Sequence, residues 1–395
     1  MLAKPRRVPA RWLLAAVGAL ACAGALSFSA WSDTPNWSNA DSLFYQAMSL
    51  EVEGQSAQAA RTRVFDSPLA QPAILREPSV GQPAWQVFEG QFFRRRWLVP
   101  TLAAAARPVA GERALPDVAI IGYLLFAVAL SLLLASRFPV VVSLGAVALC
   151  LALGPTRDWA TRPMTDSWGL ALAVAAMLSA LVVLSRGNKW LPLWIAIMLA
   201  LSFTRDLALI PLGGLAWLMW RDHDPARRRS ALILAATGIV VTIPAYLLFG
   251  ASLRSTLASI MSRFEIPTAT HSTWSYIAAH YPHLIGTTLK TDLKYAGHYP
   301  VVGLTLGVGL VALFALPAKR DALVFIARGA TLGWLIVFAI NPVFTGFRYE
   351  LLLLPGAAVG LCLLVAQLTR WHTHRRSVRT KPHPATDQTL SDLVV

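Results

Sequence analysis

Residues 201–212 read LSFTRDLALIPL, so Arg205 and Asp206 lie side by side inside an apolar run that covers about residues 190–220. One helix over this run would be about 45 Å long, which is more than the hydrocarbon core of a membrane requires. It would also hold both charges near the middle of the bilayer, at a cost of a few kcal/mol each. A single straight helix is therefore unfavourable here.

Basic residues flank this run on both sides, at Arg186, Lys189, Arg221 and 227–229. Basic loops stay preferentially on the cytoplasmic side, so a single crossing would put one of these clusters on the wrong side. We therefore expect a hairpin of two short helices, roughly 190–203 and 207–220. The turn at Thr204–Asp206 would lie at the outer membrane face.

Hydrophobic residues make up 56% of the 395-residue chain and charged residues only 14%, a balance too apolar for a soluble globular protein. Further apolar runs of roughly 17–20 residues, the length that crosses a bilayer as a helix, cover residues 12–31, 118–135, 138–154, 167–185, 231–249, 299–317, 322–340 and 351–368. With the hairpin counted as two helices, the sequence predicts an all-α, multi-pass membrane protein with about ten transmembrane helices.

The basic residues also predict the orientation of the chain. Most of them lie just outside the apolar runs, namely before the first run, in alternate short loops and after the last run. This distribution is typical of cytoplasmic segments, so we expect both termini in the cytoplasm and the protein in a bacterial cytoplasmic (inner) membrane. It also explains the net charge of +15, and no nucleic-acid partner is predicted.

A single transmembrane domain is expected over residues 1–369, with large extracytoplasmic loops at 32–117 and 250–298. The polar and basic tail over 370–395 is predicted to be disordered. A cleaved signal peptide is the alternative for the first run, because SFSA before Trp31 is an acceptable cleavage site.

The sequence contains no motif of a nucleotide-binding, protease or thiol-redox module. The three cysteines, Cys22, Cys150 and Cys362, lie inside predicted helices and have neither disulfide nor metal-ligand spacing. His280 and His283 are spaced as metal ligands can be, but no carboxylate or cysteine accompanies them. No metal site is therefore predicted.

The first outer loop begins with WSNADSLFYQAMSLEVEG, residues 37–54. Its apolar residues fall on one side of a helix and Asp41 and Tyr45 on the other, which predicts an amphipathic helix on the membrane surface. Asp41 lies near the start of this helix, where a simpler interpretation is that it caps the N-terminus. The other large loop contains a second predicted amphipathic helix at 253–265.

Three arginines, Arg94–Arg96, lie beside aromatic residues in FFRRRWLVPTLAAAAR, residues 92–107. They suit an interfacial anchor, and arginine forks equally suit the oxygens of a lipid phosphate. Two tight outer turns also carry charge: Asp166 heads the run at 167–185, and Arg348 heads the last run beside Tyr349 and Glu350. Capping and interfacial anchoring are the simpler interpretations. Together with the hairpin tip, these turns predict a polar cavity that opens outward.

Taken in order, these segments resemble the GT-C superfamily of integral-membrane glycosyltransferases. The resemblance rests on one span and a long outer loop with NADSLFYQAM and FFRRRWLVPTLAAAAR, then a span headed by RPMTD, a hairpin with FTRD at its tip and a final span headed by FRYELLLLP. It covers most of residues 12–368. Such enzymes transfer sugars from polyprenyl-phosphate donors on the extracytoplasmic side, which implies a mannosyltransferase-like activity, with a membrane lipid as the donor.

The resemblance also implies roles for single residues. Asp41 matches the catalytic acid of the first loop, which would take a proton from the acceptor hydroxyl. The donor phosphate would be bound by Arg205, Arg348 and Arg96. Asp206 is expected to orient Arg205 or to contact the acceptor, and the other supporting residues are Asp166, Tyr45 and Glu350. Many members have paired acids where this chain has Asp41 alone, so a need for a divalent cation stays open, as does the acceptor.

Two other functions remain compatible with the sequence. Carriers also contain broken helices with charged tips, so a multi-pass transporter or lipid flippase is one alternative. A non-catalytic relative of the family is the other, because the second acid of the first-loop pair is missing.

Overall fold

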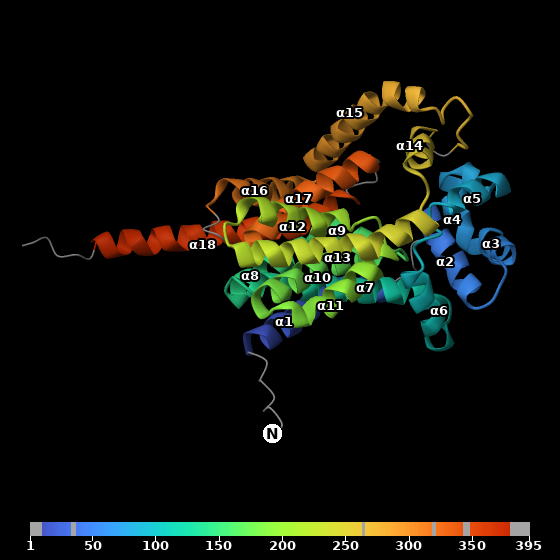
Figure 1. Ribbon diagram of the computed structural model, residues 1–395. Coiled ribbons are helices and arrows are strands. Elements are labelled where there is room, and N and C mark those ends of the chain that lie inside the picture. Colours follow the sequence, from blue (N-terminus) through green and yellow to red (C-terminus); the bar gives the residue numbers. More distant parts are fainter. Residues whose placement is uncertain (1–9, 33–36, 263–264, 318–320, 343–347, 380–395) are drawn as a thin grey trace, which may run out of the picture.

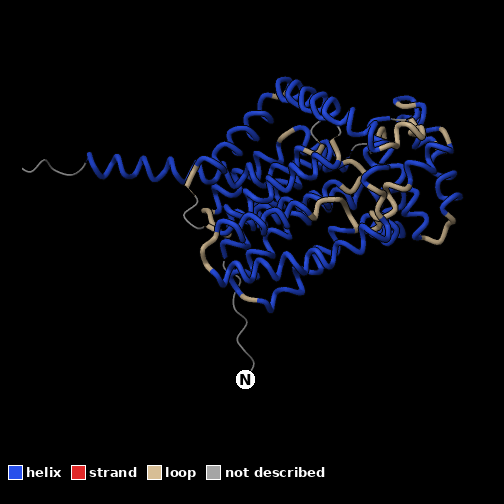
Figure 2. The backbone as a smooth tube through the Cα atoms, turned by 45° about the horizontal axis from the view of Figure 1, so that its top comes forward, coloured by secondary structure: helices blue, strands red, loops and turns tan. Residues whose placement is uncertain are grey.

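The computed structural model describes residues 10–32, 37–262, 265–317, 321–342 and 348–379, and no strand occurs among them (Figure 2). Most helices pack side by side in a bundle, and a smaller group forms a lobe at one end of it (Figure 1). The lobe contains α2 (Ala40–Val52), α3 (Ala57–Phe65), η1 (Pro68–Ala70), α4 (Gln71–Arg76), η2 (Pro78–Gly81), α5 (Pro83–Gly90) and α6 (Leu98–Ala110).

The bundle and its connections contain α1 (Ala10–Ser32), η3 (Gly111–Arg113), α7 (Ala114–Ala135), α8 (Val140–Ala152), α9 (Gly154–Thr161), α10 (Asp166–Arg186), η4 (Asn188–Trp190), α11 (Leu191–Ser202), α12 (Leu209–Arg221), α13 (Pro225–Phe249), α16 (Pro300–Ala315), α17 (Ala322–Ile340), η5 (Glu350–Leu353) and α18 (Leu354–Arg379). Between α13 and α16, the chain forms α14 (Leu253–Ser262) and α15 (Trp274–His298), which pass over the lobe end of the bundle (Figure 1).

Six helical segments among the described residues are long and apolar enough to cross a membrane, and the pair α15–α16, bent by 112°, would make a seventh. A multi-pass membrane protein is thus supported, but the prediction of about ten spans is not. The reason is length: α8, α11 and α12 have 13, 12 and 13 residues. A helix of this size rises only about 20 Å, which is less than the hydrocarbon core.

The two ends of the described chain lie at the same end of the bundle. α1 begins and α18 ends opposite the lobe (Figure 1). At that end Arg137, after α7, contacts Asp321, before α17. Part of the tail predicted to be disordered is helical, because α18 continues to Arg379 and no glycine or proline interrupts 370–379. Residues 380–395 lie outside the described part.

The chain reverses between α11 and α12, as the charged pair at positions 205 and 206 predicted. α13 packs along both arms of this hairpin. Trp194 in α11 donates a hydrogen bond to the Leu234 carbonyl in α13 at 3.0 Å. A Cβ atom on Gly238 of α13 would meet Leu212 of α12 and Trp194, each at 3.1 Å. The hairpin is therefore held from one side by a long apolar helix.

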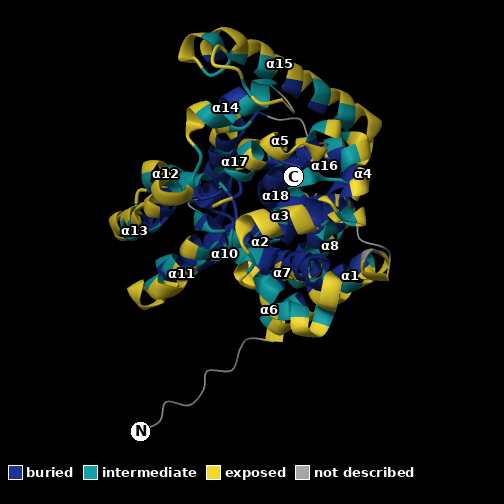
Figure 3. Ribbon diagram, turned by 90° about the vertical axis from the view of Figure 1, so that its right-hand side faces the viewer, coloured by how far each residue is buried: buried dark blue, intermediate teal, exposed yellow. Residues whose placement is uncertain are grey.

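The first helix of the lobe, α2, does not lie on a membrane surface as the pattern of residues 37–54 predicted. All residues from Ser42 to Leu50 are buried. The ring of Phe44 stacks on that of Phe93 with centroids 4.6 Å apart, and Phe65 meets it edge-on at 5.1 Å. Neighbouring lobe helices therefore cover both faces of α2. Figure 3 looks onto this end, where exposed residues line the outer helices and buried residues gather behind them.

Glycines allow the closest contacts in the bundle. Gly329 of α17 faces α12, and a Cβ atom there would lie 2.2 Å from the Gly213 carbonyl oxygen. On α18, a Cβ atom on Gly360 would be 1.8 Å from the Gly309 oxygen of α16. Small residues let helix backbones approach each other in membranes, where apolar burial drives association only weakly. These glycines therefore fix the spacing of the helix pairs.

Replacing Gly329 by leucine should destabilise the protein by about 1–3 kcal/mol, because the side chain has no room against α12. Unfolding in detergent micelles measures the effect. The matched control is Gly307→Leu, since Gly307 lies on α16 with open space around it. Equal stability of the two variants would contradict the close contact between α12 and α17.

Candidate functional site

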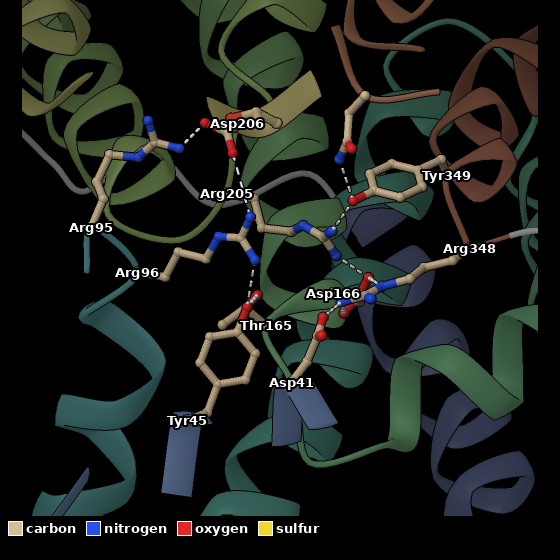
Figure 4. Close-up of polar contacts among 12 residues, drawn as sticks. Asp41, Tyr45, Arg95, Arg96, Thr165, Asp166, Arg205, Asp206, Arg348 and Tyr349 are labelled. Atoms are coloured by element: carbon tan, nitrogen blue, oxygen red, sulfur yellow. Dashed lines mark hydrogen bonds and ion pairs between the residues drawn. The ribbon is translucent and has the colours of Figure 1, made fainter. Parts of the chain in front are cut away.

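Five segments of the chain meet where the lobe joins the bundle (Figure 4). They are the start of α2, the turn before α6, the start of α10, the tip of the α11–α12 hairpin and the segment before η5. Their charged side chains form two groups. We call Asp41, Asp166, Arg205 and Arg348 the inner cluster, and Arg95, Arg96 and Asp206 the outer cluster.

Asp166 is the centre of the inner cluster. Arg348 binds it through two hydrogen bonds, Nε to Oδ1 at 2.7 Å and Nη2 to Oδ2 at 3.0 Å. Nη1 of Arg205 also contacts Oδ1. All three residues are buried. A buried carboxylate with two arginine partners holds α10, the hairpin tip and the segment before η5 together.

Asp41 joins this cluster from the lobe. Its Oδ2 lies 2.7 Å from Nη2 of Arg348, and its side chain is 24% exposed. Asn39, not Asp41, is the N-cap of α2 and accepts a hydrogen bond from the Asp41 N–H. Thr165 likewise occupies the N-cap position of α10. The capping interpretation is therefore wrong for Asp41 and for Asp166, because both side chains bind arginine instead. Asp41 still lies in the first turn of α2, where a negative charge complements the helix dipole.

Tyr349 supports the inner cluster, a role that the sequence did not reveal although the residue follows Arg348. Its hydroxyl accepts hydrogen bonds from Arg205 Nη2 at 3.3 Å and from Asn341 Nδ2 at 2.6 Å. Its backbone carbonyl accepts a hydrogen bond from Trp334. Tyr349 therefore holds the guanidinium group of Arg205 through Nη2 while Asp166 binds it through Nη1.

In the outer cluster, Asp206 contacts two arginines. Arg95 touches one carboxylate oxygen, and Nη2 of Arg96 lies 3.5 Å from the other. Of the two predicted roles of Asp206, orienting Arg205 is wrong, because Arg205 pairs with Asp166 and Asp206 turns toward the segment before α6. Contact with the acceptor stays a prediction. The side chain of Asp206 is 44% exposed, whereas those of its partners are 6% and 11% exposed.

Two tyrosine side chains, Tyr246 and Tyr45, contact the arginines of the outer cluster. The Arg95 guanidinium lies 3.8 Å from the ring centroid of Tyr246, near the end of α13. Nη1 of Arg96 donates to the Tyr45 hydroxyl at 2.9 Å, and this hydroxyl also accepts from Thr165 at 3.1 Å. The predicted supporting role of Tyr45 thus corresponds to a buried link between the lobe and α10. No sequence pattern indicated Tyr246, which comes from a distant helix.

Glu350 lies outside both clusters. Both of its carboxylate oxygens are buried and have no hydrogen-bond partner among the described residues. Thr288 of α15 donates to the Pro342 carbonyl at 3.0 Å. Thr288, and no contact of the Glu350 carboxylate, therefore links α15 to the segment after α17.

The electrostatic balance differs between the clusters. Burial disfavours the charged form of Arg348, but the Asp166 and Asp41 carboxylates outweigh this and raise its pKa well above the ordinary value. Two arginines and two aspartates balance in the inner cluster. The outer cluster has two arginines and one aspartate, which leaves one positive charge. Burial lowers the pKa of Arg95 to about 10, so it stays protonated at neutral pH.

The ion pairs occupy the region where an open polar cavity was predicted. Surface hollows lie on α3 and in a groove of about 350 Å³ between α1 and α7, and residues of the two clusters line neither hollow. Among the described residues, no group of three or more His, Cys, Asp or Glu is placed to hold a metal ion. Solvent reaches the clusters at Asp206 and Asp41, whose side chains are 44% and 24% exposed.

No family model matches the sequence, and neither a curated protein nor a solved structure matches the chain.

Glu89, at the end of α5, titrates near neutral pH close to the site. Burial raises its pKa from 4.5 to about 7, and the charge of Asp41 adds to this effect. Ser259 of α14 donates a hydrogen bond to it at 3.4 Å. In the unfolded chain the carboxyl group ionises at a lower pH than in the folded protein. The contribution of Glu89 to stability should thus be largest below pH 4.5 and be lost as the pH rises through 7.

Replacing Glu89 by glutamine should remove this part of the pH dependence, because the amide keeps an acceptor for Ser259 and does not ionise. The variant should gain stability over the parent protein between pH 5 and pH 8, as measured by thermal unfolding in detergent. Glu112→Gln, in an exposed turn, is the control and should follow the parent protein. A constant difference between Glu89→Gln and the parent at all pH values would contradict the raised pKa.

Proposed function

We propose that the protein is an integral-membrane glycosyltransferase that moves a sugar from a polyprenyl-phosphate donor to a hydroxyl acceptor on the extracytoplasmic side. The supporting observation is the position of Asp41. Arg348 holds this partly exposed carboxylate at 2.7 Å, beside two clusters that together contain four arginines. A base and an excess of positive charge are the two elements that such a transfer needs.

The proposed reaction is a substitution at the anomeric carbon of the sugar. The acceptor oxygen forms a bond to this carbon, the bond from the carbon to the phosphate oxygen breaks, and the hydroxyl proton passes to Asp41. The lipid phosphate leaves as a monoester with one more negative charge than it had as a diester. The net positive charge of the two clusters favours this product and the transition state that leads to it.

A lipid donor agrees with the surroundings of the site. Six helical segments among the described residues can cross a membrane, and the clusters lie at the lobe end of this bundle. The chain of a polyprenyl lipid would lie in the bilayer beside these helices, with its phosphate at the level of the clusters. The acceptor would approach from the aqueous side, where Asp41 is exposed.

The variant Asp41→Asn tests the proposal. Protein reconstituted in vesicles with a radiolabelled polyprenyl-phosphate sugar should form a labelled product, and the variant should be at least about a hundredfold slower because it lacks the base. Glu53→Gln is the matched control, since Glu53 ends the same helix and pairs with Arg107. Transfer by the parent protein with undiminished transfer by Asp41→Asn would exclude Asp41 as the base. Movement of intact donor across the vesicle membrane, without any transfer, would contradict the proposal and favour a flippase.

A further inference from the structure

The Asp206 carboxylate lies between two arginines at the exposed edge of the site. We propose that Arg95 and Arg96 form the phosphate-binding subsite, and that Asp206 occupies the place of the phosphate until a ligand displaces it. This inference deepens the proposed function, because it assigns the donor phosphate to the outer cluster. Of the residues expected to bind the phosphate, it keeps Arg96, adds Arg95 and leaves out Arg205 and Arg348.

The inner cluster is unsuited to bind a further anion. Arg205 and Arg348 share Asp166, and Arg348 also holds Asp41, so their two charges are already balanced. A phosphate at this place would add negative charge to a buried and neutral group of ions, which is costly. It would also have to break hydrogen bonds of 2.7 and 3.0 Å to Asp166.

The outer cluster has donors that no neighbour uses. The Nε atoms of Arg95 and Arg96 are both buried and have no hydrogen-bond partner among the described residues. A buried donor without an acceptor costs about 1–3 kcal/mol. The carboxylate of Asp206 offers only two oxygens to two guanidinium groups. The donor phosphate is a diester with two terminal oxygens, and the monoester that leaves has three terminal oxygens and a second negative charge. The leaving phosphate therefore matches the unused donors better than the carboxylate does.

The two arginines are also preorganised. The Tyr246 ring supports Arg95 at 3.8 Å, and the Tyr45 hydroxyl accepts from Arg96 at 2.9 Å. These contacts lie away from Asp206, as Figure 4 shows for Arg96, whose bonds to Tyr45 and to Asp206 leave in opposite directions. A ligand that replaces Asp206 would therefore meet guanidinium groups that are already in position, which lowers the entropy cost of binding.

Asp206 is the acidic residue that can leave most easily. Its side chain is 44% exposed, whereas that of Asp166 is 5% exposed and bound by two arginines. It lies in the turn between α11 and α12, outside any helix. If the Asp206 side chain turned toward solvent, water would hydrate its charge, and the phosphate would neutralise Arg95 and Arg96. The exchange leaves no buried charge without a partner.

The test is binding of dodecyl phosphate and of inorganic phosphate to the purified full-length protein in a neutral detergent, measured by calorimetry. Asp206→Asn should bind dodecyl phosphate roughly tenfold more tightly, as expected when a competitor holds a site about nine-tenths of the time. Arg95→Gln should bind it at least about tenfold more weakly, because it loses charge-assisted hydrogen bonds. Arg95→Lys keeps the charge but loses the planar guanidinium group that donates two hydrogen bonds at once, so it should also bind dodecyl phosphate more weakly.

The control is Asp158→Asn, which changes an aspartate with a 54% exposed side chain that is paired with Arg162. Its affinity for dodecyl phosphate should equal that of the parent protein.

Weaker or unchanged binding by Asp206→Asn would overturn the proposal, since Asp206 would then be only a structural counter-ion. Tighter binding of dodecyl phosphate alone would identify a lipid ligand, and equal tightening for inorganic phosphate would identify a phosphate site without lipid selectivity. The outcome is separable from the proposed function. Tighter binding without any sugar transfer would keep the subsite and reject the transferase, and transfer without tighter binding would do the reverse.

Discussion

The arrangement at the lobe end depends on one buried carboxylate, that of Asp166, and its two arginine partners. Removing charges from water costs several kcal/mol per ion, and the cost is offset only when each charge has its partners in good geometry. Arg205 comes from the tip of the α11–α12 hairpin and Arg348 from the segment before η5. The requirement to complete this cluster therefore fixes where the hairpin ends and where the last helix begins. It reaches the lobe as well, because Arg348 also binds Asp41.

The inner and outer clusters differ in charge and burial, and they suit different tasks. The inner cluster has no net charge and is largely buried, which suits a scaffold that holds Asp41 at a defined place. The outer cluster has one unbalanced positive charge, an exposed aspartate and two unused donors, which suits the binding of an anion from solvent. A carboxylate in one cluster and an anion subsite in the next place a base and a leaving group side by side, as a transfer from a lipid phosphate requires.

Local sequence patterns predicted the elements and part of the site. The length of the apolar run, the basic residues on both flanks and the cost of two charges in a bilayer core together predicted the hairpin tip at Arg205, and Asp41, Asp166 and Arg348 were expected to meet it. The partners of single side chains were not predictable. Asp206 pairs with Arg95 and Arg96 and not with its neighbour Arg205, and Arg95 packs on Tyr246. Helix packing determines which distant segments meet, and local sequence does not show it.

Helix packing also explains why α2 is buried on all sides although its sequence pattern is amphipathic, because the rest of the lobe covers it. The prediction of about ten spans is not confirmed, because an apolar run predicts a helix but does not determine its length.

The most direct test of this account is a double-mutant cycle between Asp166 and Arg348, with Asp166→Asn, Arg348→Gln and the double variant compared by reversible unfolding in mixed detergent micelles. If both side chains belong to one buried cluster, each single variant strands a charge, and the coupling between the two changes should be at least about 1 kcal/mol. Additive effects, within about 0.5 kcal/mol, would mean that the two residues do not meet, and both the fold of the lobe end and the site built on it would be contradicted.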